Sequence, residues 1–218
     1  MAALIDLSHV VEAGMTTYPG MPGPIVCDYL SREASREHYD GETTFHIAKI
    51  EMIANTGTYV DSPFHRYEHG ADLSELDLAS LANLEGVVID ARAAVDAVDA
   101  GLFAGLDVKG KAVLVRTGWD RHWATERYLS GHPFLTRPIA ELLRDGGAAI
   151  VGIDSLNVDD TRGGGRPVHS TLLGAGIPVA EHLCNLGALP ASGFRFHAVP
   201  VKFRGVGTFP VRAYAVVS

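Results

Sequence analysis

The chain has few cysteines, a shortage of basic residues and no long apolar run, and each shortage excludes a class of protein. Cys27 and Cys184 are the only cysteines among 218 residues, too few for a disulfide framework or a zinc–thiolate site. Eighteen Lys and Arg against 26 Asp and Glu give a formal net charge of -8. This charge opposes binding to a phosphate backbone, so we expect no nucleic-acid partner.

No uninterrupted apolar run approaches the ~20 residues that span a bilayer. The first residues, Met-Ala-Ala-Leu-Ile-Asp, lack the basic start and apolar stretch of a signal peptide. Repeats and low-complexity tracts are also missing, which excludes solenoids and propellers. Hydrophobic residues make up 47% of the chain, enough for a full core. We therefore predict a cytoplasmic protein without membrane contact, folded as one domain over 1–218.

Apolar patterns predict strands at both ends of the chain and an alternation of strands and helices in the middle. Strands are predicted at 4–10, 45–54, 86–90, 111–117, 148–153, 194–201 and 208–217, helical turns at 73–84, and helices at 137–144 and 178–186. The 45–54 strand has apolar side chains on both faces, as in a strand covered on both sides. The Pro- and Gly-rich residues 14–24 predict a loop. The whole pattern favours a mixed α/β domain.

The strongest local signal is Asn-Thr-Gly-Thr-Tyr-Val-Asp-Ser-Pro-Phe-His at 55–65. Gly57 permits a tight bend and Pro63 fixes a second one. A loop that curls back here can turn Asp61 and His65 inward, where they could hold a divalent cation. A turn with a capping Asp and a surface His accounts for the same spacing at least as well, so spacing alone leaves both interpretations open.

A second candidate segment lies far downstream. His169 follows a glycine-rich loop at 163–165, and Glu181 lies in an otherwise apolar segment predicted to be helical. A carboxylate among apolar neighbours costs free energy unless a charge or a metal compensates for it. The alternative is an exposed helix face on which Glu181 pairs with Lys or Arg. The two segments nevertheless supply complementary metal ligands: Asp61 with His169 and Glu181.

The 55–65 segment resembles the signature His-x-Gly-Thr-His-x-Asp-x-Pro-x-His of the cyclase family of metal-dependent hydrolases, which includes kynurenine formamidases and isatin hydrolases. Four other segments are also similar to this family: Asp-Leu-Ser-His at 6–9, Thr-Gly-Trp at 117–119, Gly-Ile-Asp at 152–154 and Pro-Val-Arg-Ala at 210–213. The resemblance implies a β/β/α fold with a partly open mixed β-barrel flanked by helices. It also implies a homo-oligomer, either a dimer or a tetramer.

The resemblance places Asp61, His169 and Glu181 at the family's metal-ligand positions. The sequence departs from the signature at two positions, because Asn55 and Tyr59 stand where the first two histidines belong. We therefore expect one Zn or Mn ion where relatives can hold two. Tyr59 is predicted to donate a hydrogen bond to the oxyanion that develops during the reaction, and Asn55 to orient the substrate.

The resemblance also implies that a metal-activated water attacks an amide or ester carbonyl, with His65 as the proton-transfer group. Phe64 and Trp119 are candidates for aromatic contacts with the substrate, although aromatic residues are as often simply core. His46 is a possible replacement ligand, but its position is more typical of a half-buried strand histidine.

Three function classes fit these observations. The first is a hydrolase of an arylformamide or a cyclic amide, and the second is a hydrolase of lactones or other esters, because pocket shape sets the leaving group. The third is a catalytically silent relative that binds a small molecule. The departures at Asn55 and Tyr59 favour the third class, whereas the complete set of ligands with His65 favours an enzyme.

Overall fold

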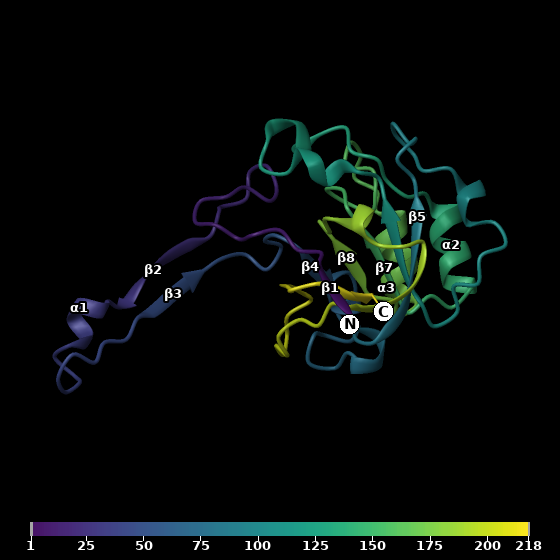
Figure 1. Cartoon of the computed structure of the whole chain (residues 1–218). Coiled ribbons are helices and arrows are strands. Elements are labelled where there is room, and N and C mark those ends of the chain that lie inside the picture. Colours follow the sequence, from purple (N-terminus) through teal and green to yellow (C-terminus); the bar gives the residue numbers. More distant parts are fainter. Residues whose placement is uncertain (1, 218) are drawn as a thin grey trace.

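The computed structural model describes residues 2–217. Figure 1 shows a main body from which a long hairpin arm extends, with the two ends of the chain close together. The strands are β1 Ala3–Asp6, β2 Ile25–Leu30, β3 Ile47–Glu51, β4 Tyr59–Asp61, β5 Leu84–Asp90, β6 Ala112–Arg116, β7 Ile150–Ile153, β8 Val179–Glu181, β9 Ser192–His197, β10 Thr208–Pro210 and β11 Tyr214–Val217. The α-helices are α1 Arg32–Ser35, α2 Arg137–Asp145 and α3 Pro167–Gly174. Short 3-10 turns lie at Pro63–His65 (η1), Leu78–Ser80, Ala100–Phe103, Trp119–His122, Glu126–Leu129 and Leu186–Ala188.

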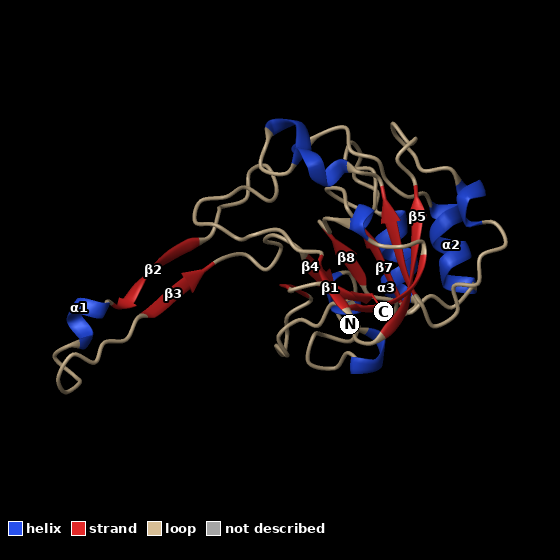
Figure 2. Ribbon diagram, viewed as in Figure 1, coloured by secondary structure: helices blue, strands red, loops and turns tan. Residues whose placement is uncertain are grey.

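Nine strands form one curled sheet in the order β1-β11-β9-β5-β6-β7-β8-β4-β10. The strands from β5 to β8 run parallel, and the remaining pairs are antiparallel. The partly open mixed barrel flanked by helices is therefore confirmed (Figure 2). β4 pairs antiparallel with β8, and these two neighbouring strands carry site residues.

Two apolar cores hold this sheet in place, one on each face. On the outer face, Val113 and Val151 pack with Ile139 of α2 and Leu172 of α3. On the inner face of the curl, Leu114 belongs to the second core. Side chains alternate along a strand, so a continuous apolar strand such as β6 or β7 supplies both cores. This explains why the middle strands were predicted correctly.

Helix α2 confirms the prediction at 137–144. Pro138 lies in the first turn, where its missing N–H is not needed. Ile139 and Leu143 lie four residues apart and are buried in the outer core. Gly146 caps the helix C-terminus, and its amide donates to the carbonyl of Leu142 at 2.8 Å. The sequence thus predicts both the buried face and the C-terminal end of this helix.

The helix predicted at 178–186 is wrong. Residues Val179–Glu181 form β8, a buried strand between β7 and β4. A short apolar run has no clear period, so it fits a helix and a buried strand equally well. The helix of this region, α3, lies earlier, directly after the glycine-rich loop. Glu181 is consequently the last residue of a buried strand, and His182 follows it with a positive φ of 56°.

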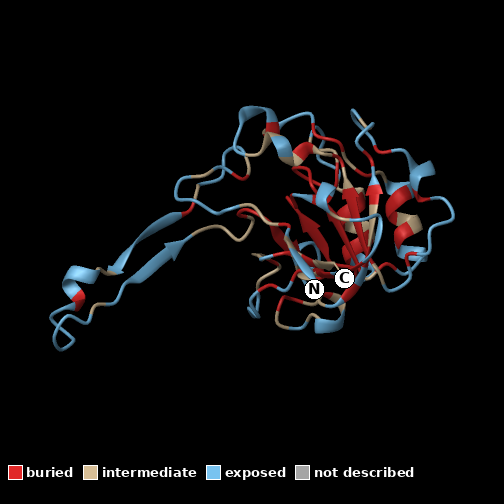
Figure 3. Ribbon diagram, viewed as in Figure 1, coloured by how far each residue is buried: buried red, intermediate tan, exposed pale blue. Residues whose placement is uncertain are grey.

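The strand predicted at 45–54 is covered on neither side. The central part of this segment forms β3, which pairs only with β2, and every residue of β3 is exposed. The two strands and α1 form an arm, residues 25–51, that extends away from the main body (Figure 3). The apolar side chains at both odd and even positions of 45–54 therefore do not indicate burial within this chain, contrary to the prediction from the sequence.

Further boundaries also differ from the predictions, among them β9, which ends at His197, four residues earlier than predicted. The helical turns predicted at 73–84 are reduced to the single 3-10 turn Leu78–Ser80, and β5 begins at Leu84. The segment 208–217 contains two strands: β10 is at one edge of the sheet, and β11 is next to the strand at the other edge. β1 ends at Asp6, four residues earlier than predicted. Within residues 2–217, none of the helices is both long enough and apolar enough to cross a membrane.

We expect Gly207→Ala to destabilise the fold close to the site, because a Cβ at this position would collide with backbone atoms of Phe64 and His65. Overpacking of this kind costs about 1–3 kcal/mol. In a chain of this size, thermal denaturation should show a Tm lower by about 2–4 °C per kcal/mol. Gly163→Ala is the matched control, since a Cβ there meets nothing within 4 Å. An unchanged Tm for Gly207→Ala would contradict the close approach.

Candidate metal centre

Four elements bring the ionisable side chains of the candidate centre together. Asp61 lies on β4, His65 on η1, His169 on α3 and Glu181 on β8. β4 and β8 pair antiparallel with Tyr59 opposite Glu181. Because side chains two residues apart share a face of a strand, Tyr59, Asp61 and Glu181 point to the same side of the sheet.

The centre of this cluster is an imidazole between two buried carboxyl groups. The Nε2 atom of His169 lies 3.5 Å from Oδ2 of Asp61 and 3.5 Å from Oε1 of Glu181. Oδ2 of Asp61 is buried and has no hydrogen-bond partner among residues 2–217. An unpartnered buried carboxylate oxygen is costly in a protein, and a divalent cation is the usual partner for such an oxygen beside an imidazole. These donors therefore fit a Zn or Mn ion.

Ligand atoms of Asp61, His65 and His169 all lie within 4.8 Å of one another. This compact group contains His65 in place of Glu181, which the resemblance gave as the third ligand. The Nδ1 atom of His65 lies 3.6 Å from Oδ1 of Asp61, and the His65 side chain is 36% exposed. Two alternative third ligands thus lie around the same pair, Asp61 and His169.

Asp159 fixes the orientation of His169. One carboxylate oxygen of Asp159 accepts a hydrogen bond from Nδ1 of His169 at 2.7 Å and from its amide at 3.0 Å. The other oxygen accepts from the amide of Val168 at 2.7 Å. When His169 is neutral, its proton is on Nδ1, which donates to Asp159, and its lone pair is on Nε2, which faces the two site carboxyl groups. A carboxylate behind an imidazole is a common arrangement around protein-bound metals.

Thr208 of β10 connects Asp61 with His65. Its hydroxyl makes a short hydrogen bond to Oδ1 of Asp61 and lies 2.9 Å from Nδ1 of His65. A hydroxyl has one proton to donate, and a carboxylate can only accept it. Thr208 therefore donates to Asp61 and accepts from Nδ1 of His65, which leaves the His65 lone pair on Nε2.

Tyr59 binds Glu181 through a phenol hydroxyl. The hydroxyl lies 2.6 Å from Oε2 of Glu181 and 3.1 Å from the hydroxyl of Tyr18. Asn157 donates from Nδ2 to the hydroxyl of Tyr18 at 2.8 Å. Burial, reinforced by the charge of Glu181, raises the pKa of Tyr59 well above its usual value of 10.0. Tyr59 therefore keeps its proton and acts as a hydrogen-bond donor.

Burial and charge also shift the pKa values of the two central groups. Burial raises the pKa of Glu181 to about 7, against the opposing charge of His169. Burial alone lowers the pKa of His169, but Glu181, Asp159 and Asp61 outweigh this effect and raise it to about 10. The buried carboxyl groups therefore favour a positive charge beside them, either the proton on His169 or a bound cation.

A cavity of about 270 Å³ opens onto the cluster. Five of the residues singled out in the sequence line this cavity: Asn55, Tyr59, His65, His169 and Glu181. Asp61 lies beneath it and is fully buried.

The structure does not bring three other candidates to this cavity. Phe64 is half-buried and lies outside the lining. Trp119 is buried in a small core with Tyr128, to whose carbonyl its Nε1 donates at 3.0 Å. His46 lies on the arm, with its Nε2 2.8 Å from Oδ1 of Asp28.

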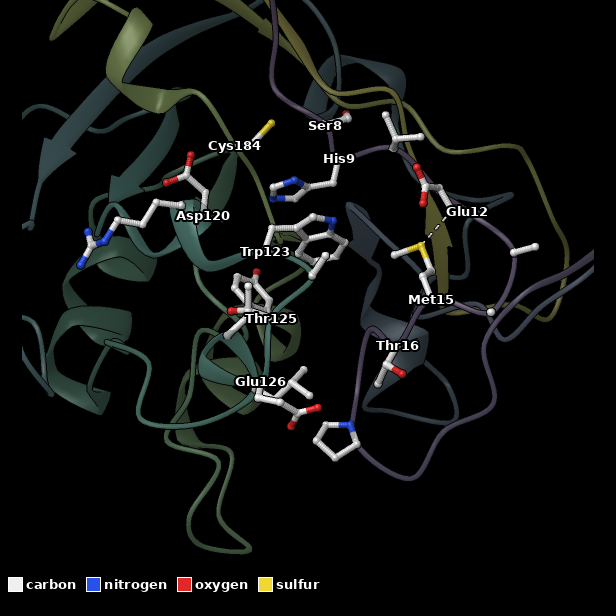
Figure 4. Close-up of a pocket in the computed structure, with 18 of the residues that line it drawn as sticks. Ser8, His9, Glu12, Met15, Thr16, Asp120, Trp123, Thr125, Glu126 and Cys184 are labelled. Atoms are coloured by element: carbon white, nitrogen blue, oxygen red, sulfur yellow. Dashed lines mark hydrogen bonds between the residues drawn. The ribbon is translucent and has the colours of Figure 1, made fainter.

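A larger cavity, of about 1050 Å³, lies between the loop after β1 and the Trp119–Leu129 region (Figure 4). The rings of His9 and Trp123 stack there, 4.0 Å apart. None of the residues predicted for the site lines this larger cavity. The candidate chemistry is therefore confined to the smaller cavity.

Sequence reasoning missed Asp159, Thr208 and Asn157. Asp159 lies beside Asp160 in a polar segment, so its sequence context does not distinguish it from a surface residue. Thr208 carries no signal either, since hydroxyl residues occur in every kind of loop and strand. Their roles come only from strands and loops that meet in space.

Comparisons with known proteins show relatives of similar sequence and fold. The Cyclase family model matches residues 5–160. Kynurenine formamidase from Salinibacter ruber is 28% identical over 220 residues, covering 97% of this chain and 96% of that protein. The enzyme of the same name from Geobacillus thermodenitrificans is 26% identical, covering 96% and 95%. The structure of an isatin hydrolase bound to the product analogue thioisatinate superposes with a TM-score of 0.84 at 24% identity, covering 99% of this chain and 92% of that one.

We expect Asp159→Asn to weaken metal binding, because an amide lacks the negative charge that supports the basicity of His169 and has one acceptor oxygen where the carboxylate uses two. Chelator competition with Zn or Mn should show an affinity about 10–100-fold lower than that of the wild type. The control is Asp160→Asn, which removes the same charge from the neighbouring residue. Asp160 is paired with Arg162 in an exposed ion pair, so this change should leave the metal affinity unchanged. Equal affinities for the wild type and Asp159→Asn would contradict the orienting role.

Proposed function

The chain belongs to the cyclase family, and from this premise we propose that it is a metal-dependent hydrolase of an amide, either an arylformamide or a cyclic amide. One observation carries the proposal: the unpartnered Oδ2 of Asp61 and the Nε2 of His169 face the same point beside Glu181. The names of the relatives, kynurenine formamidase and isatin hydrolase, support a carbon–nitrogen bond as the target.

Asp61, His169 and Glu181 would hold one divalent cation, Zn or Mn. When bound, this cation supplies Lewis acidity, which makes water a stronger nucleophile and polarises a carbonyl. Tyr59 occupies Oε2 of Glu181 with a hydrogen bond of 2.6 Å, so this oxygen is engaged by a phenol and not by a second ion. This contact supports one ion per site.

His65 carries the proton-transfer role in this proposal. Thr208 holds Nδ1 of His65, so Nε2 has the lone pair that accepts a proton from the attacking water. The water oxygen forms a bond to the carbonyl carbon, the C–N bond breaks, and His65 returns the proton to the leaving nitrogen. Asn55 lines the cavity and would orient the substrate. Tyr59 would donate to the developing oxyanion by exchanging its hydrogen bond to Glu181 for one to the oxyanion, because a phenol has one proton to donate.

The test is to assay the metal-loaded wild type on formanilide, isatin and a lactone, together with elemental analysis of the purified protein. We expect about one divalent ion per chain and turnover of an amide. Turnover of the lactone alone would move the substrate class to esters. No ion bound after Zn or Mn is added, together with no turnover, would identify a silent relative and overturn the proposal.

We expect His65→Ala to lose about 10²–10⁴-fold in kcat while it keeps its metal, because proton transfer is removed and the ligands remain. Glu181→Gln should instead weaken metal binding. His69→Ala, an exposed histidine outside the cavity lining, is the matched control. If His65→Ala loses the ion and Glu181→Gln keeps it, the ligand set is Asp61, His65 and His169, and the assignment of His65 is wrong.

The arm supports a homo-oligomer. Seven of its apolar side chains are exposed: Ile25, Val26, Tyr29, Tyr39, Phe45, Ile47 and Ile50. An isolated two-stranded hairpin is at best marginally stable in water, and apolar surface on both of its faces favours a partner. A second copy related by a two-fold axis buries both arms in one interface. We propose a dimer or tetramer joined through the arm.

We expect Ile50→Asp to shift this oligomer towards monomers, because Val26 and Ile50 are directly opposite each other on one face of the arm, and a carboxylate there resists burial. Light scattering after size-exclusion chromatography measures the mass. Lys109→Asp makes a charge change at an exposed position of the main body, outside the arm, and is the control for a general charge effect. A monomeric wild type, or an unchanged mass for Ile50→Asp, would contradict the role of the arm.

A further inference from the structure

Two guanidinium groups line the small cavity above the candidate metal centre, those of Arg66 and Arg166. Both are held against the first turn of α3. Nε of Arg66 donates to Oγ of Ser170 at 3.1 Å, and the amide of Ser170 donates to the carbonyl of Arg166 at 3.0 Å. The Arg166 guanidinium is fixed further, because its Nη1 donates at 2.7–3.2 Å to three backbone carbonyls, those of Asp160, Gly163 and Gly165.

No carboxylate neutralises these two cations. Within residues 2–217 neither forms an ion pair, whereas Arg92, Arg162 and Arg212 each pair with an aspartate. Glu181 is the one carboxyl group in the lining of this cavity, and it faces His169 at 3.5 Å and Tyr59 at 2.6 Å. The cavity therefore concentrates unpaired positive charge in a chain whose formal net charge is -8.

The hydrogen bonds leave donors available on both groups. Arg66 uses Nε and Arg166 uses Nη1, and no bond to a residue in 2–217 occupies Nη2 of either side chain. Guanidinium groups present planar forks that match a carboxylate, and bonds between such charged groups are among the strongest in proteins. A cavity of about 270 Å³ has room for a substrate with one ring.

We propose that the substrate is an anion whose carboxylate is held by Arg66 and Arg166 while its amide lies at Asp61, His169 and Glu181. This inference rests on the proposed amide hydrolase function and narrows its substrate class to small carboxylated amides. Arg166 is the N-cap residue of α3, the helix that carries His169, and Arg66 contacts Ser170 of the same helix. One rigid element would therefore position both the carboxylate and the amide of the substrate.

The test compares formanilide, which is neutral, with 2-formamidobenzoate, which adds one carboxylate to the same ring. The metal-loaded wild type should have the higher kcat/KM for the anion. Arg66→Gln should lower kcat/KM for the anion by about 10–100-fold, mainly through KM, and change the value for formanilide by less than about twofold. Arg66→Lys should restore part of the preference. Arg137→Gln, on the exposed start of α2, is the matched control.

Two outcomes overturn the inference: a wild type that prefers formanilide, or an Arg66→Gln variant that loses both activities equally. If neither compound is hydrolysed, the proposed function fails, and equilibrium binding decides the inference separately. Calorimetry on metal-loaded protein then compares benzoate with benzamide. Benzoate binding that Arg66→Gln removes and Arg137→Gln retains supports the anion site, and equal or absent binding of the two compounds overturns it.

Discussion

The burial of two carboxyl groups beside one imidazole is the constraint on which the site depends. Asp61 and Glu181 are nearly inaccessible to water, and one oxygen of Asp61 lacks a hydrogen-bond partner among the described residues. Such a pair is stable only near positive charge, either a protonated His169 or a divalent cation. The curled sheet brings β4 and β8 together, and α3 places the imidazole over them, so the fold itself creates the need for a cation.

The tyrosine in the altered signature is chemically consistent with this constraint. The phenol of Tyr59 cannot lose its proton in a buried site beside Glu181, so it donates a hydrogen bond where a histidine would offer a lone pair. Tyr18 and Asn157 extend this contact into a network. The departure from the signature thus puts a hydrogen-bond donor to one oxygen of Glu181 where relatives have a histidine, and Oδ2 of Asp61 has no partner among residues 2–217.

The charge of the cavity lining differs from that of the chain as a whole. The chain is acidic as a whole, yet the cavity combines a candidate cation site with two unpaired guanidinium groups. These two guanidinium groups are the reason that we propose an anionic ligand over a neutral one. The exposed apolar arm is a separate feature, positioned away from the main body, and its surface fits contact between copies of the chain.

The sequence alone determined the mixed α/β class, the middle strands and helix α2, because these follow from local pattern and residue type. It also offered Asp61, His65, His169 and Glu181 as candidates, on the resemblance to the cyclase family. Tertiary structure decided that 179–181 is a strand, that the apolar 45–54 segment is exposed, and that Phe64 and Trp119 lie outside the cavity. It also introduced Asp159 and Thr208, because a hydrogen bond between residues far apart in the chain depends on three-dimensional position, which no local pattern records.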